Sequence, residues 1–220
     1  MKIQIPIILV VGRSGSGKTT YIEKLIGELN NRGYRIATIK HAQEIHFNAG
    51  KDSERHLAAG SEAVVVAAPE RTVMIKKTDP EGSLEQAARM LGDGYDLILA
   101  EGFKQGDAAK IVIKREGFEL PLDNLTRVAA VATDKPYPGN VRQFALQDIK
   151  AAADFLEAGF IKPGEERLSL YLNGEPLPLI AFPRKLMAGM LKGMISSLKG
   201  VEQVNRLAVF LSAGKTNKER

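Results

Sequence analysis

Residues 7–19 read IILVVGRSGSGKT, an aliphatic run that passes directly into the pattern G-x-x-x-x-G-K-[ST]. The run over 7–11 predicts a buried strand, and the apolar residues of 21–31 recur at helical spacing. A strand, a glycine-rich loop and a helix in this order form a phosphate-binding loop. In such a loop, backbone N–H groups and the positive end of the helix surround phosphate oxygens. The stretch therefore predicts an α/β fold with a site for a nucleoside triphosphate.

The pattern also assigns roles to single residues. Glycine lets the backbone close around phosphate oxygens. The loop residues expected to make such contacts are Gly12, Gly15, Ser16 and Gly17. Lys18 is expected to reach the β- and γ-phosphates as a catalytic residue, and the Thr19 hydroxyl is expected to ligate Mg²⁺. The fixed letters match by chance in roughly one chain in a hundred of this length, and the flanking strand and helix make a chance match rarer still.

The composition narrows the class of protein further. The 220 residues suffice for one full α/β domain and a smaller module. The absence of cysteine excludes disulfides, thiolate metal sites and cysteine nucleophiles. No stretch reaches the apolar length of a membrane span, and the N-terminal apolar run ends in the glycine loop without a signal-cleavage pattern. We therefore expect a cytoplasmic protein that does not associate with a membrane.

The net charge of +5 is concentrated at the C-terminal end. Residues 166–220 hold nine of the 31 Lys and Arg residues and four of the 26 Asp and Glu residues, which accounts for the whole excess. These charges are diffuse and few aromatic residues lie among them, unlike the basic patch of a nucleic-acid-binding surface. We expect no nucleic acid as a partner, and we favour protein docking as the role of this segment.

Strand-like and helix-like segments alternate through the first 160 residues. The further predicted strands are 34–39, 96–100, 111–114 and 128–133, the predicted helices are 52–59, 83–91 and 146–157, and 63–67 with 72–75 forms a predicted hairpin. Alternation of this kind after a phosphate-binding loop predicts a P-loop NTPase-like, mostly parallel sheet with helices on both faces. We expect this nucleotide-binding domain to span residues 1–160.

The rest of the chain predicts a separate module. We expect a linker at 161–166, a small β-β-α-β module at 167–212 and a disordered tail at 213–220. Asn173-Gly174 is a two-residue hairpin signal, and prolines in the return strand place that strand at a sheet edge. After Pro183, Met and Leu recur along one stripe of a helix. We expect the stripe to pack on the module's own sheet, with a partner-binding face as the alternative.

Ligands of such sheets bind outside the carboxyl ends of the strands. The residues at predicted strand ends are Lys40, His41, Glu101, Gly102, Thr133 and Asp134. Glu101 is expected to hold Mg²⁺ through water or to orient an attacking water, which makes it the second predicted catalytic residue. Gly102 is expected to offer its N–H to the γ-phosphate. Asp96 begins the same strand, about 16 Å from its other end, and is set aside.

For several residues near these strand ends, two interpretations remain open. Lys40 and His41 contact either phosphate or a partner protein. Asp134 either contacts guanine, although the N-K-x-D context is missing, or serves only the turn that follows it. Lys104 is either within reach of a phosphate or acidic partner, or an ordinary exposed lysine. The three histidines between residues 41 and 56 lack the spacing of a zinc motif.

Several segments together resemble the MobB family, the molybdopterin-guanine dinucleotide biosynthesis adaptor proteins. In chain order they are GRSGSGKTT (12–20), IKH (39–41), GKDS (50–53), AG (59–60), DLILAEGFK (96–104), KIVIK (110–114) and VATD (131–134). The glycine loop alone is common to many nucleotide-binding proteins, whereas IKH, GKDS and EGFK together are specific to the family. The resemblance covers roughly residues 5–160.

The resemblance implies a GTP-binding adaptor that assists the enzyme attaching GMP to molybdopterin. Members use GTP and Mg²⁺, hydrolyse GTP weakly or on stimulation by a partner, and are commonly homodimers. The implied partners are a MobA-like molybdenum cofactor guanylyltransferase and molybdopterin. The implied nucleotide contacts are Gly15, Gly17, Lys18, Thr19 and Thr20. The other residues that fall in the family's functional motifs are Lys40, His41, Lys51, Asp52, Ser53, Glu101, Gly102 and Lys104.

Two parts of the chain depart from the family. The loop at 42–49 is shorter than usual, and Asn48 stands where an aspartate is expected, so no metal role is carried over to that loop. Residues 166–220 lie outside the common family domain and take no function from it. The alternative to the adaptor is a small-molecule kinase with the same phosphate-binding loop. Such kinases carry an arginine-bearing lid, and the sequence shows no arginine-rich insertion of that kind.

Overall fold

A computed structural model of the chain describes residues 5–42, 44, 51–76, 84–92, 94–118, 121–136, 138–161, 168, 170–172, 175–177, 179–200, 207 and 209. The chain forms two compact units, residues 3–165 and 166–220. The expected linker lies next to this division, and nearly all of it falls outside the described residues.

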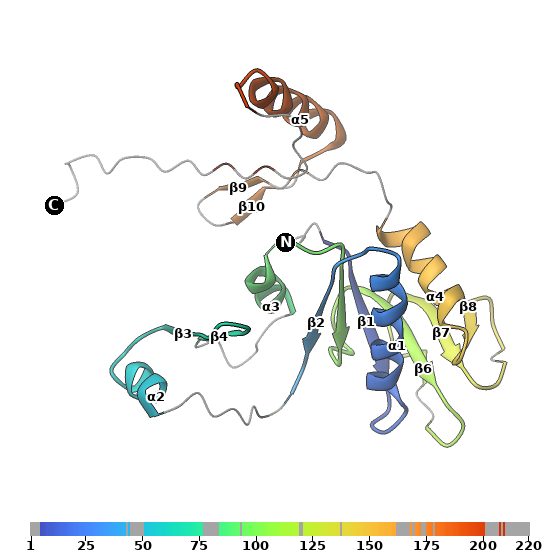
Figure 1. Cartoon of the computed structure of the whole chain (residues 1–220). Coiled ribbons are helices and arrows are strands. Elements are labelled where there is room, and N and C mark those ends of the chain that lie inside the picture. Colours follow the sequence, from blue (N-terminus) through green and yellow to red (C-terminus); the bar gives the residue numbers. More distant parts are fainter. Residues whose placement is uncertain are drawn as a thin grey trace. The chain divides into compact units, whose positions relative to one another are not determined.

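The first unit is built on a six-stranded sheet in which every neighbouring pair is parallel (Figure 1). Its strands are β1 (Ile7–Gly12), β2 (Ile36–Lys40), β5 (Leu97–Glu101), β6 (Ala109–Lys114), β7 (Val128–Thr133) and β8 (Arg142–Ala145), in the order β2-β5-β1-β6-β7-β8. The predicted parallel sheet is confirmed. Strand β8 was not predicted, because Phe144 is its only buried residue and its sequence lacks an apolar run.

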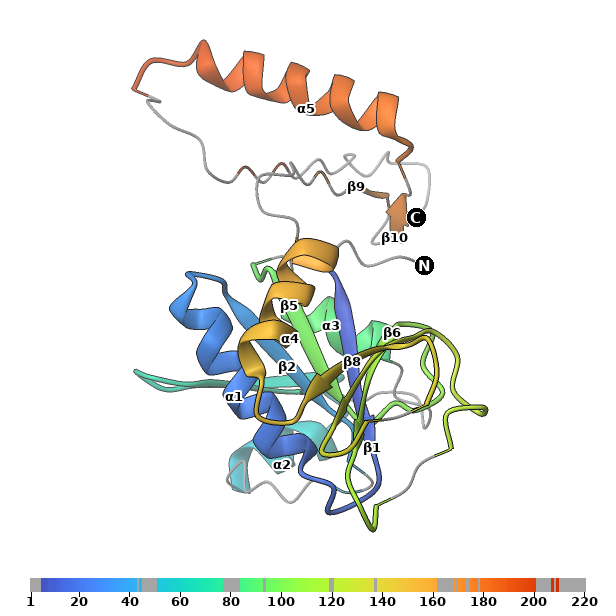
Figure 2. The same cartoon turned by 90° about the vertical axis from the view of Figure 1, so that its right-hand side faces the viewer.

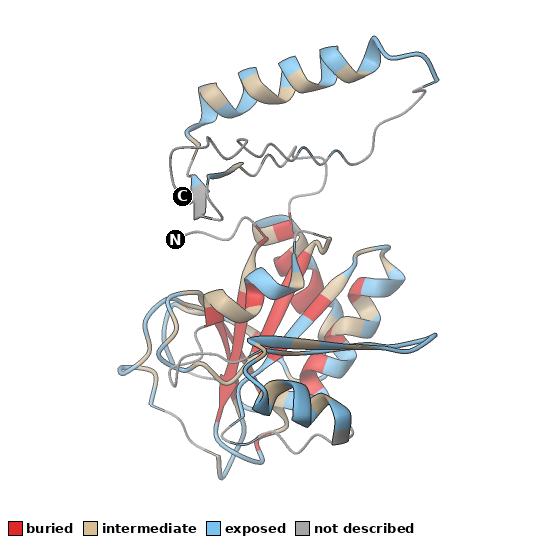
Figure 3. Ribbon diagram, turned by 90° about the vertical axis from the view of Figure 1, so that its left-hand side faces the viewer, coloured by how far each residue is buried: buried red, intermediate tan, exposed pale blue. Residues whose placement is uncertain are grey.

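Helices cover both faces of the sheet, as predicted. Helices α1 (Lys18–Asn31) and α4 (Ile149–Leu156) pack on one face, and α3 (Leu84–Leu91) packs on the other (Figure 2). Side chains of β1 alternate between the two cores, with Ile8 and Val10 facing α1 and with Leu9 and Val11 facing α3. All four are fully buried, so β1 lies at the centre of the fold. Figure 3 shows that the buried residues gather in the sheet.

Helices α1 and α4 are joined by a cluster of charged side chains. Arg32, just after α1, contacts Glu28 at 2.8 Å, Asp154 at 2.6 Å and Glu157 at 2.8 Å. The Tyr34 hydroxyl also donates to Glu157, at 2.6 Å. The hydrogen bonds from Tyr34 and then from Arg32 lower the pKa of Glu157. The cluster therefore stabilises the ionised form of the Glu157 side chain.

Helix α4 begins later than predicted. Asp148 caps it by accepting a hydrogen bond from the Ala151 N–H at 3.1 Å, so the helix starts at Ile149 and not at Leu146. It continues into a wider π-type turn over Glu157–Ile161.

The excursion between β2 and β5 holds the other predicted elements. They are helix α2 (Lys51–Ala58) and the antiparallel hairpin of β3 (Ala63–Ala67) and β4 (Thr72–Lys76). Residues of both strands alternate between half-buried and exposed. Val65 and Met74 are paired across the hairpin and are 53% and 49% exposed, so the described part of the chain leaves an apolar side of the hairpin uncovered. The predicted cap of α3, Ser83, lies outside the described residues.

The described residues of the second unit form a short antiparallel hairpin and one long helix. The hairpin consists of β9 (Leu170–Leu172) and β10 (Glu175–Leu177), and the helix is α5 (Ala181–Ser196). The expectation that the apolar stripe packs within the module is wrong for half of it. Met187, Leu191 and Ile195 are half-buried. A neighbouring row remains exposed and consists of Phe182, Leu186, Met190, Met194 and Leu198. Within the described residues, no helix is long and apolar enough to cross a membrane.

Candidate functional site

The glycine loop joins β1 to the start of α1. Gly15 and Gly17 have φ angles of +78° and +91°, a region in which other residues are strained. Helix α1 has no side-chain cap and no acidic residue in its first turn. Its first N–H groups and its positive dipole end therefore favour an anion. The Lys18 ammonium lies at the same loop and donates to the Arg13 carbonyl at 2.8 Å.

A hydroxyl and a carboxylate meet beside this loop. The parallel register of β1 and β5 places Glu101 opposite Val10, two residues before the loop begins. From there the Glu101 carboxylate accepts a hydrogen bond from the Thr19 hydroxyl, with distances of 3.2 Å to Oε1 and 3.1 Å to Oε2. These are hard oxygen ligands of the kind that Mg²⁺ prefers, so the pair fits the predicted metal. In the described part of the chain, no three His, Cys, Asp or Glu side chains form a metal-binding group.

The ends of β2 and β5 are fastened to each other. Lys40 is the register partner of Glu101, and the His41 N–H donates to the Glu101 carbonyl at 3.0 Å. The His41 ring packs on Phe103, with ring centroids 4.9 Å apart. Gly102 has a φ of +99°, and a Cβ there would lie 2.8 Å from the Cβ of His41. The predicted residues of the IKH and EGFK segments thus meet at one edge of the sheet.

A buried lysine anchors the segment that follows Gly102. Lys110, at the start of β6, is fully buried and donates to the carbonyls of Gly106 at 2.6 Å, Thr126 at 2.8 Å and Ala108 at 3.4 Å. Burial lowers its pKa. Because Gly106 belongs to the connection from β5 to β6, this lysine holds in place the segment that begins at the Glu101 end of β5.

Other predicted residues are arranged differently. Asp52 lies in α2, apart from the sheet (Figure 1), and its ion pair is with Arg55 at 3.5 Å. The structure thus gives no contact between Asp52 and the glycine loop among the described residues. The Asp134 carboxylate accepts hydrogen bonds from the Glu116 N–H at 3.1 and 3.3 Å, so it supports a turn after β6. Lys104 is exposed.

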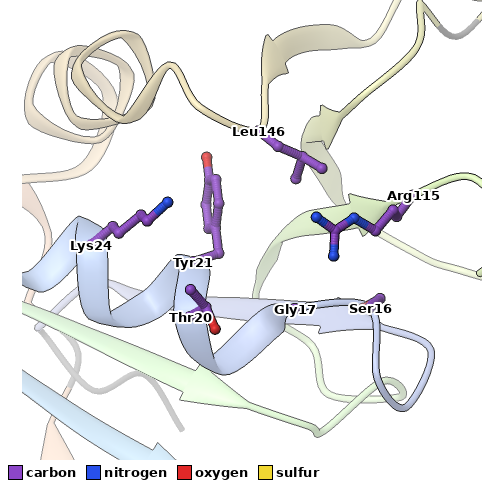
Figure 4. A pocket seen from close by; sticks show the side chains of 7 residues that line it. All are labelled: Ser16, Gly17, Thr20, Tyr21, Lys24, Arg115 and Leu146. Atoms are coloured by element: carbon purple, nitrogen blue, oxygen red, sulfur yellow. The ribbon is translucent and has the colours of Figure 1, made fainter.

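A pocket of about 120 Å³ opens beside the glycine loop, on the side of α4 (Figure 4). Its wall consists of Ser16, Gly17, Thr20, Tyr21, Lys24, Arg115 and Leu146. Burial, and then the charge of Asp148, raise the pKa of Tyr21 to about 12. Sequence reasoning missed Tyr21, Lys24 and Arg115. Arg115 directly follows β6, so the same strand-end rule that selected Glu101 would have found it.

Comparison with known proteins gives a consistent result. The family model described as "Molybdopterin guanine dinucleotide synthesis protein B" matches residues 7–134. A Haemophilus influenzae molybdopterin-guanine dinucleotide biosynthesis adapter protein is 40% identical, and the alignment covers 71% of this chain and 90% of that protein. A Methanocaldococcus jannaschii relative is 28% identical over 95% of this chain and 98% of its own length, so it also spans most of the second unit. A crystal structure of molybdopterin-guanine biosynthesis protein B has a TM-score of 0.56 at 27% identity, covering 69% of this chain and 98% of its own.

Proposed function

The chain belongs to the family of molybdopterin guanine dinucleotide synthesis protein B, and on that premise we propose that it is a GTP-binding adaptor in molybdopterin-guanine dinucleotide biosynthesis. In this role it binds GTP with Mg²⁺ in the cytoplasm and assists the enzyme that attaches GMP to molybdopterin. The observation that carries the proposal is the contact of Thr19 with Glu101 beside the uncapped start of α1. This contact joins a phosphate-binding loop to a pair of metal ligands.

Each part of this edge has a task in nucleotide binding. The loop from Gly12 to Gly17 offers backbone N–H groups to the phosphates, and Lys18 exchanges the Arg13 carbonyl for phosphate oxygens. Thr19 and Glu101 hold Mg²⁺, which neutralises charge on the β- and γ-phosphates when it is bound. We expect the Gly102 N–H to reach the γ-phosphate, because Gly102 directly follows Glu101 at the same strand end.

The same arrangement supports slow hydrolysis of GTP. Among the described residues, Glu101 provides a carboxylate beside the loop. Its role is to orient water toward the γ-phosphate. A single group that both faces the metal and orients water gives weak catalysis, which a partner protein can raise by adding a cation. We expect that partner to be a MobA-like guanylyltransferase, with molybdopterin as its substrate.

We also propose that the adaptor is a homodimer. The uncovered apolar side of the β3–β4 hairpin supports this, because Val65 and Met74 are half exposed on a two-stranded element that is marginal by itself. A Val65→Lys protein is expected to have the mass of a monomer in sedimentation or light-scattering measurements. Dimers of unchanged stability would contradict the proposal.

The test of the main proposal is binding of GTP in the presence of Mg²⁺. We expect Lys18→Ala to weaken binding about 10- to 100-fold, as expected for the loss of a charge-assisted hydrogen bond. Lys76→Ala removes an exposed lysine of β4 and is the matched control, with unchanged binding. Glu101→Gln is expected to reduce the gain in affinity that Mg²⁺ provides. A Lys18→Ala protein that binds GTP as tightly as the unmodified chain would contradict the assignment of the loop.

A further inference from the structure

The turn that follows β6 lies against the glycine loop. A Cβ placed on Gly15 would be 3.0 Å from the Phe118 ring, and one on Gly17 would be 3.8 Å from the Arg115 guanidinium. The Phe118 N–H donates to the Arg115 carbonyl at 2.9 Å and closes the turn. Because β6 and β5 flank β1 on opposite sides, this turn covers the loop on the side away from Glu101.

The pocket on that side is built for a ligand with both anionic and hydroxyl groups. Lys24 and Arg115 line it, and none of the described residues in its wall is acidic. The Arg115 guanidinium points into the space between Tyr21, Leu146 and the loop (Figure 4). The hydroxyls of Ser16 and Tyr21 are buried and have no hydrogen-bond partner among the described residues. A buried hydroxyl without a hydrogen-bond partner destabilises the folded chain. A ligand that provides a partner removes that destabilisation.

The position of the pocket defines which part of a nucleotide it receives. Thr19 and Glu101, which would hold Mg²⁺ beside the terminal phosphates, lie on the β5 side of the loop. The pocket lies on the β6 side of the loop, and Gly17 and Thr20 are part of its wall. The part of the nucleotide that extends away from the metal is the α-phosphate with its ribose.

We propose that Arg115 is a phosphate-binding residue, which clamps the α-phosphate from the β6 side while the sugar occupies the pocket beside Tyr21. This assignment rests on the proposed binding of GTP. It adds a cation to the one that Lys18 provides, in the same chain and on the opposite side of the loop from the proposed metal ligands. Its ligand class is any nucleotide with a 5′-phosphate, whether mono-, di- or triphosphate.

Asp134 takes a positioning role in the same arrangement. Its carboxylate holds the Glu116 N–H, and Lys135 contacts the Glu116 carboxylate at 2.6 Å. Both contacts fasten the end of β7 to the turn that carries Arg115. Asp134 therefore acts through Arg115, since its carboxylate oxygens accept from the Glu116 N–H in that turn.

The first experiment measures the affinities of GTP, GDP and GMP. We expect Arg115→Ala to weaken all three by a similar factor of about 10- to 100-fold, because all three contain the α-phosphate. Lys18→Ala should weaken GTP and GDP far more than GMP. Arg115→Lys should recover part of the loss, and Arg71→Ala, at the hairpin turn, removes the same charge elsewhere and should have no effect. Arg115→Ala binding within twofold of the unmodified chain, or a loss equal to that of Arg71→Ala, would overturn the proposal.

The second experiment separates positioning from base reading. Asp134→Ala should weaken GTP, ITP and GMP together, whereas Asp134→Asn keeps an oxygen that accepts from the Glu116 N–H and should restore most of the affinity. A change of base preference in Asp134→Asn, from guanine toward xanthine, would show that the residue reads the base and would overturn its positioning role.

These outcomes are distinct from failure of the proposed function. If the unmodified chain binds no GTP, or if Lys18→Ala has no effect, the function itself is wrong. If Lys18→Ala weakens GTP and Arg115→Ala does not weaken GMP, only the inference about Arg115 is wrong. Circular dichroism of each variant checks that it is folded. Arg115→Gln, like Arg115→Ala, removes the charge of this exposed residue and serves as a second test variant.

Discussion

Replacing Gly102 by alanine tests whether the ends of β2 and β5 must meet as closely as they do. The φ of +99° at Gly102 is unfavourable for alanine by roughly 1–2 kcal/mol. The new Cβ would also lie 2.8 Å from the Cβ of His41, which is fixed to the backbone and cannot rotate away. Relieving such an overlap adds about 1–3 kcal/mol. We therefore expect Gly102→Ala to lower the free energy of unfolding by roughly 2–5 kcal/mol.

Gly33→Ala is the matched control for the backbone effect. Gly33 has a φ of +87°, and a Cβ there would meet nothing within 4 Å. Its substitution should thus remove only about 1–2 kcal/mol. The difference between the two variants isolates the contact with His41.

The assay is urea unfolding monitored by circular dichroism. The variants are compared only if the free energy of unfolding depends on urea concentration with the same slope. Binding of GTP with and without Mg²⁺ is measured in parallel, because a shift of the strand end moves Glu101 relative to Thr19. If Gly102→Ala is no less stable than Gly33→Ala, then the two strand ends are free to separate and the reasoning is refuted. A loss of stability with unchanged Mg²⁺ dependence would refute only the link to the metal ligands.

Three other predictions concern the support of the site. Lys110→Met leaves the carbonyls that Lys110 serves without a donor and should lower the unfolding free energy by about 2–4 kcal/mol in urea, while equal stability would contradict its anchoring role. The contribution of Glu157 should be complete above its usual pKa of 4.5 and lost as the pH falls through its lowered folded value. In the Tyr34→Phe protein, the free energy of unfolding should fall less on acidification than in the unmodified chain. Asp148→Ala removes the cap of α4 and should lower the melting temperature, by an amount equivalent to about 0.5–2 kcal/mol.

The buried strands and the glycine loop could be predicted from sequence because their signals are local. Ile7–Val11 is an unbroken apolar run, and the loop that follows has fixed letters for backbone and phosphate chemistry. The register that brings Glu101 beside Thr19 follows from the strand-end rule for parallel sheets. The resemblance to a family added the guanine nucleotide and the partners, which the residues alone leave open.

The features that were missed depend on contacts between distant segments. Lys110 looks like a solvent-exposed lysine in sequence, because a fully buried lysine is rare. Its partners Gly106 and Ala108 lie within four residues, but the third carbonyl, that of Thr126, comes from the segment before β7. The strand-end rule would have selected Arg115, but its approach to the glycine loop depends on a turn that the sequence does not reveal. Strand β8 is short and mostly exposed, so only its pairing with β7 defines it.

The central place of β1 has a consequence for how the chain folds during synthesis. Ile7 pairs with Ile98 on one side, and Ile8 pairs with Ala109 on the other, so both neighbours of this first strand are made long after it. At translation rates of about 5–20 residues per second, its apolar side chains wait roughly 5–20 s for a partner strand. We expect the nascent chain to bind a chaperone through this segment until β5 and β6 have left the ribosome.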